Sequence, residues 1–107
     1  MSEVIVAGGD PEGIGAALEA RGGTVRYAEG TASRSALEAA GVESADALVV
    51  TDVGLATSVT VGLECNPDLR TVVYARESAP EFVRGQADHI VDPELLGPDT
   101  LAEELLR

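Results

Sequence analysis

Short β-branched runs alternate with alanine- and leucine-rich stretches along the whole sequence, and this alternation constrains the fold more than any other feature. The β-branched runs cover residues 4–7, 24–28, 47–50, 72–75 and 89–91. The helical stretches cover residues 16–21, 32–40, about 55–65, a short segment from 78, and 98–107. Strands that alternate with helices predict right-handed crossovers and a parallel sheet with helices on both faces. We therefore expect an α/β fold, a Rossmann-like three-layer sandwich whose five-stranded parallel sheet has the order 2-1-3-4-5.

Local signals indicate where several of these helices begin and end. Glycines at 22–23 and at 41 are expected to end two helices, and the Asn66-Pro67 pair a third. Ser78 and Glu81 have the spacing of a capping box, which predicts the start of a short helix.

The chain carries a strong excess of negative charge. Nineteen acidic residues face seven basic ones, all of them arginine, and the formal net charge is −12. Self-repulsion on this scale destabilises a small domain in dilute buffer, but at molar salt the Debye length falls to about 3 Å. The composition therefore predicts a halophilic protein, of archaeal origin, and disfavours nucleic acid and anionic membranes as partners.

Length and cysteine content predict one cytoplasmic domain over residues 1–107. A chain of 107 residues is near the commonest domain size. The single cysteine, Cys65, cannot form an intramolecular disulfide, which favours a reducing compartment. No signal peptide is visible, and no stretch approaches the roughly 20 apolar residues that cross a bilayer, so we expect no membrane insertion.

A glycine-rich loop follows the first predicted strand, where a parallel sheet commonly binds ligands. Gly9, Gly13 and Gly15 have the spacing G-x-x-x-G-x-G, and Gly8 precedes them. Such a loop lets a phosphate approach backbone N–H groups at the start of a helix. The loop also contains Asp10, Pro11 and Glu12, which suit the start of a helix without any ligand. Phosphate binding and simple helix capping therefore both remain open.

Glu29 ends the second predicted strand, about 20 residues beyond Gly9, where an acidic residue can bind a ribose hydroxyl. A solvent-exposed carboxylate is the alternative in a chain this acidic.

Several segments in order resemble the RCK-N (TrkA-N) family, the nucleotide-binding domains that regulate potassium transporters and channels. The resemblance covers roughly residues 24–96. Its segments are Ser35–Val42, Ala45–Asp52, Asn66–Leu69, Val72–Arg76 and Ala87–Pro93. Family members usually have G-x-G-x-x-G and a further strand–helix pair, which this chain lacks.

The resemblance implies a Rossmann-like domain that binds NAD or an adenine nucleotide. It places Thr51 and Asp52 on the adenosine side and Arg76 near a phosphate, with a surface ion pair as the alternative for Arg76. The expected binding residues are Gly8, Gly9, Asp10, Gly13, Gly15, Glu29, Thr51, Asp52 and Arg76. It also implies a transporter or channel partner and a homodimer, for which Leu101, Leu105 and Leu106 of the last helix offer docking side chains.

No set of residues resembles a catalytic centre or a metal site. His89 and Cys65 are the only histidine and cysteine, and no serine stands in a G-x-S-x-G elbow. We therefore expect a non-enzymatic nucleotide sensor linked to potassium transport. The alternative is an interaction or oligomerisation module that has lost its nucleotide.

Overall fold

The computed structural model describes residues 2–10 and 12–106, and Pro11, expected in the first helical turn, lies outside them. Five strands form one parallel sheet in the order β2-β1-β3-β4-β5, which confirms the predicted order. The strands are β1 (Glu3–Ala7), β2 (Thr24–Ala28), β3 (Ala47–Val50), β4 (Arg70–Tyr74) and β5 (His89–Val91). The helices are α1 (Ile14–Ala20), α2 (Arg34–Ala39), α3 (Thr57–Cys65), α4 (Glu81–Arg84) and α5 (Pro98–Leu105), with 3-10 turns η1 (Val42–Ser44) and η2 (Val53–Leu55).

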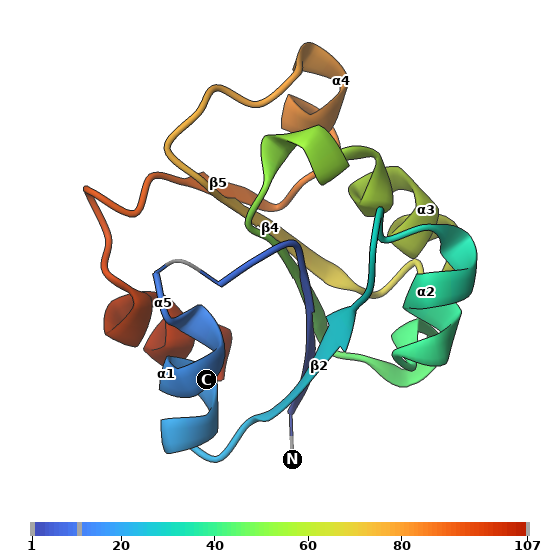
Figure 1. Cartoon of the computed structure of the whole chain (residues 1–107). Helices are drawn as coiled ribbons and strands as arrows, with labels where there is room; N and C mark the ends of the chain where they lie inside the picture. Colours follow the sequence, from blue (N-terminus) through green and yellow to red (C-terminus); the bar gives the residue numbers. More distant parts are fainter. Residues whose placement is uncertain (1, 11, 107) are drawn as a thin grey trace.

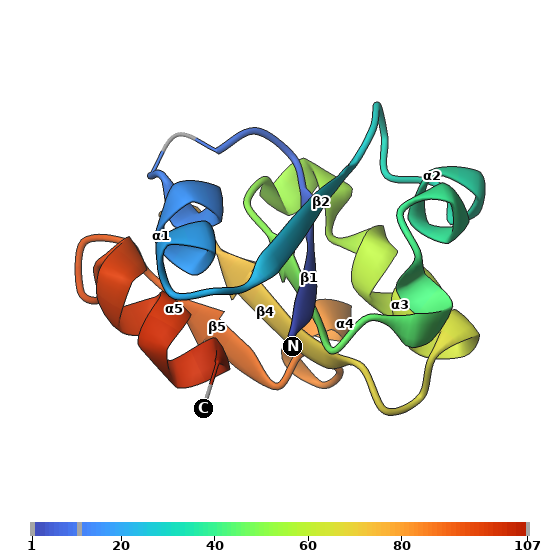
Figure 2. The same cartoon turned by 90° about the horizontal axis from the view of Figure 1, so that it is seen from below.

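The sheet is covered on both faces, as Figures 1 and 2 show: α1 and α5 lie on one face, and α2, α3 and α4 on the other. Each face has its own apolar cluster. Leu18 of α1 and Leu101 of α5 pack with Val6 and Val49, whereas helices on the opposite face pack over Leu48. Side chains of successive strand residues alternate between the faces, so each central strand supplies both clusters.

Two details differ from the sequence-based expectation. Leu55 lies in the 3-10 turn η2 rather than in α3. The capping box predicted from Ser78 is wrong, because Pro80 is the N-cap of α4 and no side chain caps that helix. Pro80 has extended backbone angles, so the helical turn begins only at Glu81.

The leucines of α5 are not free to dock a second copy. Leu101 and Leu105 are 3% and 6% exposed, and Leu106 packs against the same cluster beside α1. The spacing of these leucines therefore reflects packing within the chain and not a dimer surface. Within the described residues, no helix combines the length and apolar character needed to cross a bilayer.

Candidate functional site at the carboxyl edge of the sheet

The carboxyl ends of β1, β3 and β4 meet at one edge of the sheet, on either side of the point where the winding reverses. The loops that follow these strands border a groove of about 340 Å³. The residues that line it are Glu12, Thr51, Tyr74, Ala75, Arg76, Glu77 and Pro93. The structure therefore brings most of the sequence-predicted binding residues to one edge.

Thr51 ties the glycine loop to the end of β3. Its backbone N–H donates to the carbonyl of Ala7 at 2.9 Å, and its hydroxyl contacts the carbonyls of Ala7, at 3.2 Å, and Gly9. Gly8 allows this approach, because it has φ +108° and a Cβ added there would lie 2.6 Å from the Thr51 Oγ1. The Thr51 hydroxyl is therefore engaged within the protein.

Asp10 occupies the start of α1. Its two carboxylate oxygens accept the N–H groups of Ile14 at 2.7 Å and Gly15 at 3.0 Å. The N-cap residue itself is Gly13, in the left-handed conformation with φ +78°, so Asp10 caps from outside the usual position. The carboxylate fills the place that a phosphate would need, and the geometry therefore favours capping over phosphate binding.

The side chain of Tyr27, on β2, lies beside the start of α1. Its hydroxyl lies 3.5 Å from the Asp10 carboxylate, and a Cβ on Gly15 would collide with it. Burial raises the pKa of Tyr27, and the negative charges of Asp10 and Glu19 raise it further. Gly15 therefore allows the Tyr27 ring to lie in this position, a role that the glycine spacing alone did not indicate.

Arg76 joins the loop after β4 to the loop after β1. Its guanidinium contacts the Glu12 carboxylate at 2.5 and 3.3 Å, and Glu94 lies 3.4 Å away. Hydrogen bonding to Glu12, then the charge of Glu12, raises the pKa of Arg76. The ion-pair alternative for Arg76 is therefore observed, and we call these three residues the edge ion-pair network.

Tyr74 lines the groove from β4. Its side chain is buried, and its hydroxyl donates to the carbonyl of Leu96 at 2.7 Å. Burial raises the pKa of Tyr74, the charge of Glu12 adds to this effect, and the charge of Arg76 opposes it.

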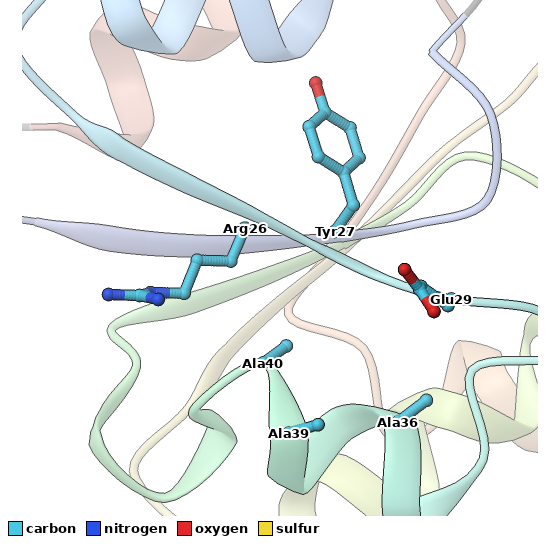
Figure 3. Close-up of a pocket in the computed structure, with 6 residues that line it drawn as sticks. All are labelled: Arg26, Tyr27, Glu29, Ala36, Ala39 and Ala40. Carbon is cyan, nitrogen blue, oxygen red and sulfur yellow. The ribbon is translucent and has the colours of Figure 1, made fainter.

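Asp52 and Glu29 lie apart from these contacts. Asp52 is exposed and caps η2, with its carboxylate accepting the N–H of Gly54 at 2.8 Å. Glu29 follows β2 and lines a second groove, of about 370 Å³, between β2 and α2 (Figure 3). The other residues of this β2–α2 groove are Arg26, Tyr27, Ala36, Ala39 and Ala40.

A family model matches residues 4–105, almost the whole chain. The chain belongs to a family of unknown function, DUF7126. No curated protein matches the DUF7126 chain. This family assignment contradicts the expected RCK-N membership.

Solved structures with the same fold include several response regulators and putative pilus assembly proteins of Burkholderia. An orphan response regulator of H. pylori is 17% identical, with a TM-score of 0.73, and the match covers 99% of this chain and 97% of that one. A CheY-like receiver domain protein of Methanospirillum hungatei is 13% identical, with a TM-score of 0.71 and coverage of 99% and 91%. A response regulator of Burkholderia pseudomallei is 23% identical, with a TM-score of 0.64 and coverage of 99% and 71%. At these identities the likeness shows the fold alone.

The expected nucleotide sensor and its link to potassium transport are therefore wrong, and the alternative of a module that has lost its nucleotide has no support either. The segments that carried the resemblance, strand runs such as Val72–Arg76 and polar residues such as Thr51 and Asp52 after a strand, are features of any doubly wound sheet. NAD does not fit the glycine loop, because Asp10 already holds the N–H groups that would face its phosphates.

The Burkholderia pseudomallei structure contains a phosphorylated aspartic acid and a calcium ion, an arrangement that requires several oxygen ligands close together. A cation such as Ca²⁺ takes six to eight oxygen ligands, several of them usually carboxylates. Among residues 2–10 and 12–106, no three His, Cys, Asp or Glu side chains are grouped to hold a metal ion. Asp10 and Glu12, the nearest candidates in the glycine loop, are engaged with α1 and Arg76. The residues at this edge do not fit a cation-assisted phosphoryl site.

Proposed function

We propose that this chain is a signal-receiving regulatory domain of the receiver type that works without phosphoryl transfer and without a bound nucleotide. The observation that supports the proposal is the edge ion-pair network, in which Glu12 and Arg76 join two loops at the carboxyl edge of a receiver-like sheet. Both loops are attached directly to central strands of the sheet, so a change at this edge can alter the surface that the domain presents.

The charges at the edge argue against a phosphoryl signal. A phosphoryl group on a carboxylate needs positive charge around it, from a cation or from basic side chains. Asp52 is the exposed aspartate after β3, but the arginine that lines this edge, Arg76, faces Glu12 and Glu94. A phosphoryl group would have to compete with two carboxylates for that guanidinium.

The edge ion-pair network is suited to open when a partner binds. The side chain of Arg76 is 53% exposed, and those of its partners Glu12 and Glu94 are 21% and 69% exposed. Ion pairs that remain in contact with solvent contribute little to stability. The two loops can therefore separate without disturbing the apolar clusters on either face of the sheet. We infer that the signal is a protein contact at this edge that replaces Glu12 or Glu94 as the partner of Arg76.

Phosphorylation is tested directly by mass. The chain is incubated with acetyl phosphate and Mg²⁺, and its intact mass is measured beside the Burkholderia pseudomallei response regulator as a positive control. We expect no phosphorylated form of this chain. Thermal unfolding with NAD, NADH, ATP, ADP and AMP should likewise show no stabilisation. A phosphorylated Asp52, or a clear shift with one nucleotide, contradicts the proposal.

The regulatory role is tested by cross-linking in the native host, with a photo-reactive residue at Asp52. A defined protein should be captured, and Arg76→Met should change its yield severalfold. The matched control is Arg84→Met, because Arg84 is also exposed and its guanidinium donates to the backbone carbonyl of Ala79 rather than to a carboxylate. No product above background, or equal effects of the two variants, contradicts the role of the edge.

Three further expectations belong to this proposal. We infer that the domain is not an enzyme, because described polar side chains at the carboxyl edge, such as Thr51 and Asp10, are engaged with backbone groups. We also expect a cytoplasmic location, which the single cysteine favours because it cannot form an internal disulfide. A homodimer would have to use exposed apolar side chains such as Leu95, which is 85% exposed, and light scattering tests for it.

A further inference from the structure

The edge strand β2 has backbone hydrogen-bonding groups that face away from the sheet. β2 pairs with β1 on one side and forms the end of the sheet on the other. The Thr24 N–H donates to the carbonyl of Ser2 at 2.9 Å, toward β1. Because the backbone groups of a strand alternate in direction, those of Arg26 and Ala28 also face β1, and those of Val25 and Tyr27 face outward. Such an edge can pair with another strand.

The helix beside this edge leaves room for a chain. Ala36, Ala39 and Ala40 of α2 and its C-cap share one helix face, with the spacing i, i+3 and i+4, and this face borders the β2–α2 groove (Figure 3). Alanine side chains are short, so a space of about 370 Å³ remains between helix and strand. Larger side chains at these positions would fill it.

We propose that the β2–α2 groove binds an extended, basic peptide segment of a partner protein, which adds to β2 as a further strand. Main-chain hydrogen bonds to Val25 and Tyr27 would hold the peptide, and its alternate side chains would lie over the alanines of α2. The proposal uses residues other than the edge ion-pair network and does not rest on the proposed function.

Charge complementarity indicates the chemistry of the peptide. Arg26 is 3.6 Å from the Glu3 carboxylate, so its charge is largely balanced. Glu29, at the other end of the groove, is exposed, and its carboxylate has no partner within the described part of the chain. The groove thus carries an unbalanced negative charge on a chain of net charge −12, which attracts a basic segment. A second copy would bring another −12 to the same edge and is disfavoured by repulsion.

The test uses two defined peptides and the full chain. One peptide of eight residues alternates arginine with valine, and its twin has glutamate in place of arginine. Binding is followed by amide chemical shifts and hydrogen exchange, at the lowest KCl concentration at which circular dichroism shows a folded chain. We expect the arginine peptide to bind at least tenfold more tightly than its twin and to slow exchange of the Val25 and Tyr27 amides.

Two variants and a matched control separate the groove from general charge. Ala39→Leu should weaken the arginine peptide about tenfold by filling the groove, and Glu29→Gln should weaken it severalfold. Glu38→Gln removes the same charge from the opposite side of α2, because Glu38 lies about 200° around the helix from Ala36, and it should leave binding unchanged.

Three results would overturn the inference. The first is equal binding of the two peptides, or binding of neither. The second is equal loss with Glu29→Gln and Glu38→Gln, which would indicate nonspecific attraction. The third is a dimer in light scattering that protects the Val25 and Tyr27 amides without peptide, which would assign this edge to a second copy.

Discussion

The carboxyl edge of the sheet and the β2–α2 groove differ in how far the protein satisfies its own polar groups. At the carboxyl edge, Asp10 holds the start of α1, Thr51 holds the glycine loop, and Arg76 faces two carboxylates. In the β2–α2 groove, the outward backbone groups of β2 and the Glu29 carboxylate have no partner among the described residues, and they border a space lined by Arg26 and alanine side chains. The protein's own side chains therefore occupy the usual ligand position at the carboxyl edge of the sheet, whereas the edge strand β2 keeps unpaired backbone groups.

The largest effect is expected from Gly8→Ala. Gly8 has φ +108°, and an added Cβ meets the Thr51 hydroxyl and the backbone of Asp52. Strain of this kind should lower the free energy of unfolding by about 2 kcal/mol, measured by denaturant titration in high salt. Gly30→Ala is the matched control, since Gly30 also has positive φ but nothing lies within 4 Å of its Cβ position. Equal losses in the two variants would mean that the Thr51 contact is unimportant.

Removal of the carboxylate at the start of α1 should have the next largest effect. Asp10→Ala leaves the N–H groups of Ile14 and Gly15 without their acceptor. We expect a loss of about 1 kcal/mol in the free energy of unfolding. Asp52→Ala should lower the free energy of unfolding by less, because the Asp52 carboxylate accepts only the N–H of Gly54, in a 3-10 turn. An Asp10→Ala variant as stable as the wild type would show that the Asp10 carboxylate does not stabilise the start of α1.

Alkaline pH should weaken the carboxyl edge through its tyrosines. The pKa values of Tyr27 and Tyr74 are raised above 10.0 in the folded chain, so both stay protonated where the unfolded chain begins to ionise. The stability they contribute is complete below pH 10 and is lost as the pH rises through the folded pKa values. Tyr74→Phe should cost about 1 kcal/mol at neutral pH, through the lost bond to Leu96, and should flatten the alkaline decline. A pH titration of unfolding that keeps the same alkaline slope in Tyr74→Phe contradicts this account.

The smallest effect on stability is expected in the β2–α2 groove. Ala39 is exposed and borders open space, so Ala39→Leu should change the free energy of unfolding by less than about 0.5 kcal/mol. The comparison variant is Ala17→Leu on α1, where the side chain is 7% exposed within the apolar cluster and overpacking should destabilise the fold. If Ala39→Leu destabilises as much as Ala17→Leu, the groove is filled rather than open. Denaturant titration of both variants decides between these outcomes.

The sequence by itself determined the strands and the sheet order of this protein. The runs at 24–28, 47–50 and 89–91 match β2, β3 and β5 at both ends. β3 is buried throughout, as a central parallel strand should be, whereas β2 and β5 are edge strands recognised from their short β-branched runs. Their alternation with helices leaves few topologies, and the observed order is the predicted one. The same alternation of strands and helices produced the incorrect RCK-N resemblance, since any doubly wound sheet has it.

Only the tertiary structure decided how the charges and hydroxyls at the carboxyl edge are used. Glu12 and Arg76 lie 64 residues apart, and Thr51 and Gly9 lie 42 apart. With nineteen acidic residues and seven arginines, composition cannot indicate which of them pair. Asp10 could have been read as a helix cap or as a neighbour of a bound phosphate, because both use the same N–H groups. Burial follows from local patterns of apolar residues, whereas the partners of polar groups depend on which loops the folded sheet brings together.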